Sequence, residues 1–67
     1  MNWAEACAAL VDGKKIRQER WLWEEYHWAF VADSDGLMRL TDSEGGIVSV
    51  MQHHMTALDW EIVEVPA

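Results

Sequence analysis

Carboxylates are the most numerous chemically active side chains in this chain of 67 residues. Nine of them, against one arginine, lie between Trp21 and Ala67, which gives this segment a charge of −8, whereas the first twenty residues carry +1. Such a segment attracts basic surfaces and repels nucleic acid and anionic membranes. The alternative is an ordinary solvated surface that keeps the protein soluble. The candidate partner-binding carboxylates are Glu24, Glu25, Asp33, Asp35, Asp42 and Glu44.

Two tryptophans stand next to these acids. Trp21 and Trp23 are two residues apart, so in strand geometry they face the same way. A domain this small cannot enclose all five of its tryptophans, and an exposed tryptophan with acidic neighbours is typical of an interface hot spot. The alternative is that both rings form the core or wrap its edge. Trp28 and Trp60 are expected in the core.

A basic cluster offers a different chemistry. Four cations within seven residues have the charge needed to hold phosphate groups. The alternative is a solvated strand beside the end of a helix. The members of the cluster are Lys14, Lys15, Arg17 and Arg20.

Metal binding and catalysis find little support in the sequence. His53 and His54 are adjacent and therefore point in different directions, and no histidine pair has the spacing of a helical zinc site. Cys7 is the single cysteine, which excludes an internal disulfide and suits a reducing compartment, and it is expected in the core. No serine stands in a nucleophile motif. We therefore expect no cofactor, no metal and no enzyme activity, and we expect a binding or inhibitory protein.

The elements that must position these groups follow from local patterns. Asn2 and Glu5 have the spacing of a capping box, and Gly13 is a natural helix stop. Aromatic and β-branched runs separated by Asp, Ser and Gly clusters indicate strands and turns. The predicted elements are a helix over 3–11, strands over 15–17, 26–31, 37–41, 47–51 and 60–65, turns over 33–36 and 43–46, and a short helix within 51–58.

This order predicts a single α+β domain spanning residues 1–67. The N-terminal helix is expected to pack on one face of an antiparallel sheet of about five strands, with Pro66 ending the last strand. No signal peptide, lipidation motif or long apolar run is visible, so we expect a soluble cytosolic protein.

Two terminal segments resemble a known family. Residues 1–6 (MNWAEA), 13–17 (GKKIR) and Trp21 are similar to its opening "M-N-F-x-E-A-L", "G-K-K-V-x-R" and "G-W". Residues 57–64 (ALDWEIVE) are similar to its closing "A-x-D-W-E-I-V-E". This is the Thoeris anti-defence sponge family of small phage and prophage proteins, whose domain is also found among anti-CRISPR proteins. The resemblance implies an α+β fold, an anti-defence role, and binding of cyclic ADP-ribose signals by oligomers.

The middle of the chain departs from the family pattern. Where the family has "N-G-K-G-M", this chain has residues 22–26 (LWEEY), and the family's later "P-W" is absent near residues 48–51. The missing glycines and lysine would have formed an anion cradle. Glu24 and Glu25 stand in their place and would oppose a diphosphate. We therefore expect this chain to share the fold of the family more closely than its sponge activity.

These observations predict a phage-encoded inhibitor of bacterial immunity. We expect an anti-CRISPR protein whose acidic surface mimics DNA and blocks the DNA-binding surface of a CRISPR effector, with Trp21 or Trp23 supplying short-range affinity. Its partner would be a basic DNA-binding subunit in the host bacterial cytoplasm, with no direct contact to nucleic acid or membrane. The inhibitor would be a monomer or a small homo-oligomer.

Two alternatives remain open at the level of sequence. In the first, the protein is a sponge that sequesters a cyclic ADP-ribose signal, with Lys14, Lys15, Arg17 or Arg20 on the diphosphate and a tryptophan stacked on adenine. In the second, it is a structural or regulatory phage protein with no immune target.

Overall fold

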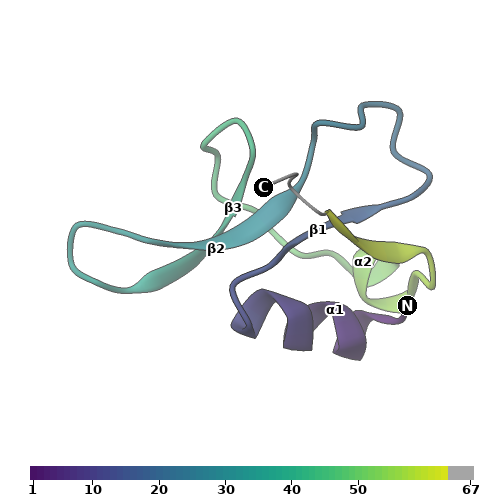
Figure 1. Cartoon of the computed structure of the whole chain (residues 1–67), viewed down its shortest axis with the longest axis horizontal. Coiled ribbons are helices and arrows are strands. Elements are labelled where there is room, and N and C mark those ends of the chain that lie inside the picture. Colours follow the sequence, from purple (N-terminus) through teal and green to yellow (C-terminus); the bar gives the residue numbers. More distant parts are fainter. Residues whose placement is uncertain (64–67) are drawn as a thin grey trace.

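The computed structural model describes residues 1–63 and shows an α+β domain in which an N-terminal helix packs on an antiparallel sheet (Figure 1). Within these residues the sheet has four strands in the order β3-β2-β1-β4, and all neighbours are antiparallel. The predicted fold class is confirmed, with four strands in place of about five. The elements are α1 (Trp3–Val11), β1 (Lys15–Gln18), β2 (Trp28–Ala32), β3 (Met38–Asp42), α2 (Gln52–Thr56) and β4 (Trp60–Val63).

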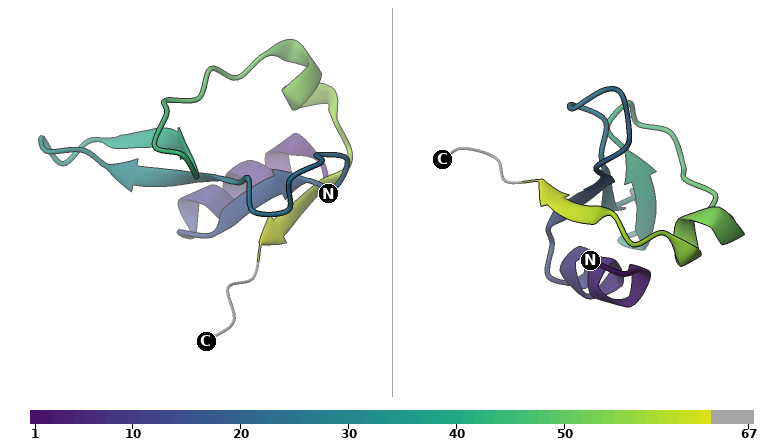
Figure 2. Two further views of the ribbon diagram at one scale, coloured as in Figure 1. Left: turned by 90° about the horizontal axis from the view of Figure 1, so that it is seen from above. Right: turned by 90° about the vertical axis from the view of Figure 1, so that its right-hand side faces the viewer.

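Helix α1 begins at the cap that the sequence predicts. Asn2 Oδ1 accepts a hydrogen bond from the backbone N–H of Glu5 at 2.9 Å, and Glu5 Oε1 accepts one from the N–H of Asn2 at 3.0 Å. Ala6 and Leu10 lie on the buried side of the helix. This side faces the sheet, so α1 packs against β1, β2 and β4 (Figure 2). The helix ends before Gly13, whose φ of 83° favours glycine.

Strand β1 is an inner strand of the sheet. Ile16 has an exposed fraction of 0% and stands opposite Trp28 of β2 on one side and Ile62 of β4 on the other. The last strand was predicted over 60–65 and is observed from Trp60 to Val63. Residues 64 and 65, together with the predicted stop at Pro66, lie outside the described part of the chain.

The inner strand β2 starts two residues later than predicted. Tyr26 and His27 belong to the preceding loop and are tied to the turn that follows β3. The backbone N–H of Ser43 donates to the carbonyl of His27 at 2.9 Å, and the Tyr26 hydroxyl donates to Asp42 Oδ2 at 3.2 Å. The first residue pair of the β2–β3 ladder is Trp28 opposite Asp42.

The two turns of the hairpin region share the sequence D-S-x-G and the same geometry. Each begins at an aspartate, Asp33 or Asp42. Its Oδ1 accepts hydrogen bonds from the backbone N–H groups two and four residues ahead, at 2.8 to 3.0 Å. The glycine three residues ahead has a positive φ, 80° at Gly36 and 88° at Gly45, which other residues rarely adopt. Both predicted turns are confirmed.

The predicted strand over residues 47–51 is wrong. Ile47 forms only an isolated bridge with Thr41, and the backbone N–H of Val48 donates to the carbonyl of Leu40 before the chain leaves β3. Val48 and Val50 are half-buried against the core, and the residues between and beside them are exposed. An extended segment that crosses the core buries every second residue, as a paired strand does. The pattern of burial therefore does not distinguish this segment from a strand of the sheet.

Tryptophan rings fill the core. Trp28 and Trp60 are 3% and 2% exposed, as predicted, and their ring centroids lie 5.3 Å apart. Trp3 of α1 packs 5.1 Å from Trp60. Cys7, expected in the core, is only half-buried, and burial raises the pKa of its thiol. Within residues 1–63, neither helix is long and apolar enough to span a membrane.

Helix α2 is shorter than the predicted range of 51–58 and is capped by a histidine. The backbone N–H of Met51 donates to His54 Nδ1 at 3.0 Å, and Trp60 Nε1 donates to the carbonyl of His54 at 2.9 Å. The His54 ring stands edge-on to Trp28, with centroids 4.7 Å apart. Burial, together with the charge of His53, lowers the pKa of His54. His54 therefore joins α2 to the tryptophan core through its Nδ1 acceptor, its carbonyl oxygen and its ring.

Candidate functional site

Arg17, a predicted phosphate ligand, is buried beneath the loop between β1 and β2. Its Nη1 lies 2.6 Å from Glu61 Oε1, and its Nη2 donates to the carbonyl oxygens of Trp21 at 2.9 Å and Trp23 at 3.4 Å. The residue is 7% exposed, and its buried Nε has no hydrogen-bond partner among the described residues. The guanidinium group thus fixes the backbone of residues 21–23.

Arg20, the other arginine of the predicted basic cluster, is also engaged. Its Nε donates to Asp59 Oδ2 at 3.0 Å, and Gln18 Nε2 donates to Oδ1 of the same carboxylate at 2.9 Å. The hydrogen bond from Arg20 is the main reason that the pKa of Asp59 lies far below its usual range. Lys14 is exposed and Lys15 half-buried, and neither makes an ion pair with a described residue. Of the four cations, Lys14 and Lys15 make no ion pair with a described residue, and the paired Arg20 keeps 67% of its side chain exposed.

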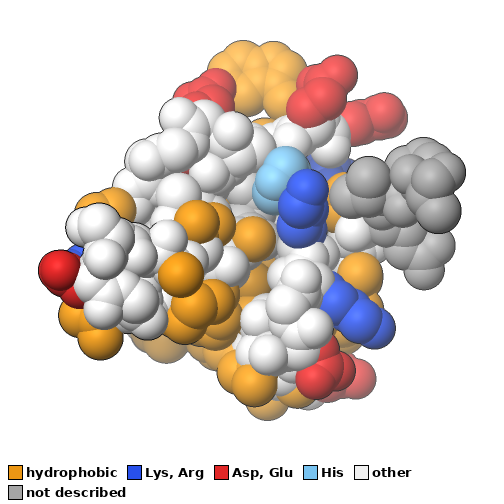
Figure 3. Space-filling view, turned by 60° about the vertical axis from the view of Figure 1, so that its left-hand side comes forward, with side chains coloured by type: hydrophobic (Ala, Val, Ile, Leu, Met, Phe, Trp, Pro, Cys, Tyr) orange, Lys and Arg blue, Asp and Glu red, His pale blue; other side chains and the backbone are white. Residues whose placement is uncertain are grey.

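The predicted acidic surface is divided into two groups. Asp33 and Asp35 lie at the closed end of the β2–β3 hairpin, and Asp42 and Glu44 lie at its open end. The five residues of β2 separate the two ends by roughly 17 Å at about 3.3 Å per residue. Figure 3 shows acidic side chains at the top of the molecule, beside an exposed apolar group, and others apart from them at the left and lower right. The carboxylates do not form one continuous stripe on this face.

Two of the predicted partner-binding carboxylates have structural roles. Asp33 accepts a hydrogen bond from Arg39 Nε at 2.7 Å, and this bond is the main reason that its pKa is lowered. The pKa of Asp42 is lowered mainly by the hydrogen bond from the backbone N–H of Gly46. Both are half-buried and hold their turns, whereas Asp35 is exposed at the hairpin tip.

The two candidate tryptophans have different environments. Trp21 is half-buried, and its ring centroid lies 5.1 Å from Tyr26 and 5.2 Å from Trp28. Trp23 is 70% exposed. Trp21 therefore packs against the core, whereas Trp23 is exposed and its role at an interface stays a prediction.

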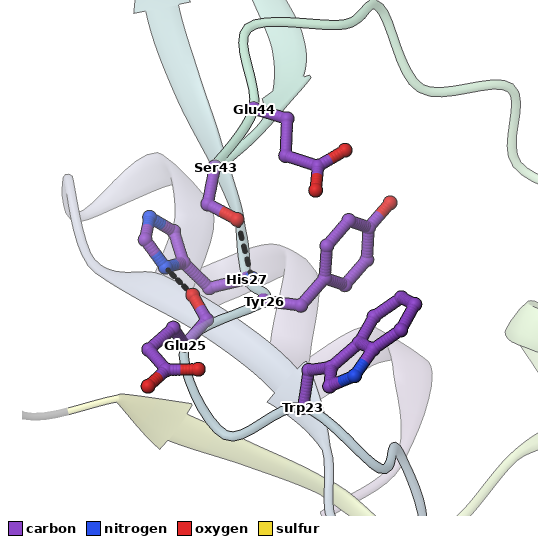
Figure 4. A pocket seen from close by; sticks show the side chains of 6 residues that line it. All are labelled: Trp23, Glu25, Tyr26, His27, Ser43 and Glu44. Atoms are coloured by element: carbon purple, nitrogen blue, oxygen red, sulfur yellow. Dashed lines mark hydrogen bonds between the residues drawn. The ribbon is translucent and has the colours of Figure 1, made fainter.

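Trp23 belongs to a surface cavity of about 440 Å³ (Figure 4). The loop between β1 and β2 supplies one side of the cavity, and the turn after β3 supplies the other. The two sides are joined where the backbone N–H of His27 donates to Ser43 Oγ at 3.3 Å. The lining residues are Trp23, Glu25, Tyr26, His27, Ser43 and Glu44.

No described residue forms an ion pair with the carboxylates near this cavity. Glu24, Glu25 and Glu44 are exposed, and their side chains make no hydrogen bond or ion pair with the described residues. By contrast, the side chains of all three arginines of the chain pair with other carboxylates. We call the surface formed by Trp23, Glu24, Glu25 and Glu44 the acidic loop surface.

Three lining residues were not singled out as site residues from the sequence. Tyr26, His27 and Ser43 reach the cavity because the Trp28–Asp42 register brings two segments sixteen residues apart into contact. No spacing rule reveals this pairing before the register is known. Among the described residues, no group of three histidine, cysteine or carboxylate side chains is arranged to hold a metal ion.

The fold and the site define a small α+β domain that carries an exposed aromatic and acidic surface. Comparison with protein-family models, with curated proteins and with solved structures finds no match to this chain. The resemblance to the Thoeris sponge family therefore stays a prediction.

Proposed function

We propose that this protein is a phage-encoded inhibitor of bacterial immunity that acts by binding a basic protein surface. In its specific form, the proposal is an anti-CRISPR protein that occupies the DNA-binding surface of a CRISPR effector. The anti-defence role comes from the family resemblance of the two chain ends. The observation that supports the mode of action is the acidic loop surface, where an exposed tryptophan stands among carboxylates that no described cation neutralises.

The charge distribution explains how such an inhibitor would associate. The chain carries a net charge of −7, so its field attracts a cationic groove and raises the association rate. The ring of Trp23 then supplies contact area at short range, as tryptophan does at many interface hot spots. The proposed surface is narrower than the set predicted from sequence, because Asp33 and Asp42 hold turns, Trp21 packs on the core, and Asp35 lies at the far end of the hairpin.

The sponge alternative receives less support from the geometry. Arg17 and Arg20, two of its four candidate cations, already pair with Glu61 and Asp59. The cavity beside Trp23 is lined by two carboxylates, which repel a diphosphate. Calorimetry with cyclic ADP-ribose isomers distinguishes the two functions, and tight stoichiometric binding would favour the sponge.

The proposed function is tested by binding to purified CRISPR effector complexes with and without target DNA. We expect one class of effector to bind the protein, target DNA to compete with it, and the affinity to fall steeply as salt rises, because exposed charges are screened. Binding that target DNA leaves unchanged, or an affinity that is flat across the salt range, would contradict the mechanism. Failure to bind any effector and to rescue phage from any CRISPR or Thoeris system would favour a protein without an immune target.

A further inference from the structure

The cavity beside Trp23 has a more specific chemistry than negative charge alone. In Figure 4 the rings of Trp23 and Tyr26 extend toward the same side of the loop, and the carboxylate of Glu44 lies beside the Tyr26 ring. Glu25 lies on the other side, next to His27. All six residues line one hollow of about 440 Å³, and Glu44 is the carboxylate that lies on the same side as the two rings.

Tyr26 and His27 of the cavity wall already form hydrogen bonds within the protein. The Tyr26 hydroxyl donates to Asp42 Oδ2 at 3.2 Å and accepts from Trp28 Nε1 at 3.2 Å, so it presents mainly its ring to a ligand. His27 Nδ1 lies 2.9 Å from the carbonyl of Glu25, which can only accept, so this ring nitrogen is engaged as a donor. The carboxylates of Glu25 and Glu44 are acceptors.

The walls are held in place before any ligand arrives. Arg17 Nη2 donates to the carbonyls of Trp21 and Trp23, and the backbone N–H of Tyr26 donates to the carbonyl of Trp23 at 3.1 Å. The opposite wall is fixed by the exchange of hydrogen bonds between His27 and Ser43. A cavity with fixed backbone loses less conformational entropy on binding than a mobile loop does.

From this geometry we propose that the cavity binds the guanidinium group of an arginine on the partner's surface. A guanidinium is planar, stacks on aromatic rings, and offers several N–H donors to carboxylates. An ammonium group satisfies the carboxylates but cannot stack, and phosphate or carboxylate ligands are repelled. The inference rests on the proposed function, since it names the side chain by which the basic partner is recognised.

The test uses the whole protein and three small probes: Nα-acetyl-arginine amide, its neutral analogue Nα-acetyl-citrulline amide, and Nα-acetyl-lysine amide. Binding is followed by NMR through the indole N–H of Trp23 and the backbone amide of Glu44. We expect the arginine probe to shift both signals, with an affinity about two- to fivefold above that of the lysine probe. Equal binding of citrulline, or of lysine, or shifts confined to other parts of the protein, would overturn the proposal.

Matched variants separate the cavity from overall charge. Glu44→Gln removes one charge from the cavity, and Asp35→Asn removes one charge from the distant hairpin tip. Both side chains are exposed, and neither makes a hydrogen bond with the described residues. We expect Glu44→Gln and Trp23→Ala each to weaken arginine binding about two- to fivefold, and Asp35→Asn to leave it unchanged. An equal loss in Asp35→Asn would show a diffuse charge effect and contradict the site.

The two proposals fail in distinguishable ways. If the arginine probe binds at Trp23 but no CRISPR effector binds, the guanidinium site is supported and the assigned partner is wrong. If an effector binds in competition with DNA but the arginine probe does not bind, the function stands and the guanidinium site is wrong.

Discussion

The guanidinium group of Arg17 donates from Nη2 to the backbone carbonyl of Trp21 at 2.9 Å. A second, longer bond from the same nitrogen reaches the carbonyl of Trp23 at 3.4 Å. A side chain that the sequence offers as an anion ligand instead fixes the loop that exposes Trp23. The buried cation therefore supports a surface of opposite charge.

The role of Arg17 predicts a specific effect of its removal. Arg17→Met loses the hydrogen bonds to the loop and the ion pair with Glu61, and we expect a loss of about 2–3 kcal/mol in the free energy of unfolding. Denaturation by urea measures this loss. Arg39→Met removes the more exposed pair with Asp33 and serves as the control, with a smaller expected effect. A greater loss in Arg39→Met than in Arg17→Met would show that the buried guanidinium is not the support of the loop.

The two D-S-x-G turns provide a matched pair of variants. Asp33→Ala and Asp42→Ala each remove the carboxylate that accepts two backbone N–H groups, so both should lower the Tm by similar amounts. Asp42→Ala also removes the acceptor of the Tyr26 hydroxyl and should alter the NMR signals of Tyr26 and Trp23. The account of the cavity wall is wrong if Asp33→Ala perturbs these signals as strongly.

Protonation of His54 should destabilise the fold. Its pKa is lowered in the folded protein, mainly by burial. The contribution of His54 to the free energy of unfolding is therefore fully present at pH values above the ordinary pKa of 6.5. As pH falls below 6.5, the unfolded chain takes up the proton first and stability declines, until pH passes the lowered pKa of the folded protein. Unfolding titrations across this range measure the decline. His54→Gln keeps an acceptor for the Met51 N–H and should flatten the pH dependence, whereas His53→Gln should largely retain it.

Hydrogen exchange tests the path of residues 47–51. The amide of Val48 is bonded to the carbonyl of Leu40 and should be protected. The amides of Ser49 and Val50 have no partner of this kind among the described residues and should exchange quickly. Slow exchange at Ser49 or Val50 would indicate a fifth strand in solution, as the sequence pattern predicts.

Helix α1 and the two turns could be predicted because short sequence motifs determine them. The capping box of Asn2 and Glu5 and the three glycines of positive φ, Gly13, Gly36 and Gly45, act within a few residues, so their spacing is sufficient to place α1 and both turns. The strand over 47–51 could not be excluded, because Val48 and Val50 alternate with exposed residues whether or not a ladder is present.

The candidate site was only partly visible in the sequence because its contacts are distant along the chain. The charge segment identified Glu24, Glu25 and Glu44 as candidates; all three are exposed, and their binding role stays a prediction. The burial of Arg17 depends on Glu61, 44 residues away, and the cavity depends on contacts between segments sixteen residues apart. Such pairings are set by strand register, which single-residue patterns do not specify.

The central claim is that the acidic loop surface, and not the total charge, binds the basic partner. Two double variants with equal loss of charge test it directly. One combines Glu24→Gln with Glu44→Gln on the surface, and the other combines Asp12→Asn, at the exposed C-terminal cap of α1, with Asp35→Asn at the hairpin tip. The measurement is the affinity for the CRISPR effector at one fixed salt concentration. We predict a loss of about tenfold in the first variant and less than about twofold in the second. Equal losses in the two variants would contradict the account.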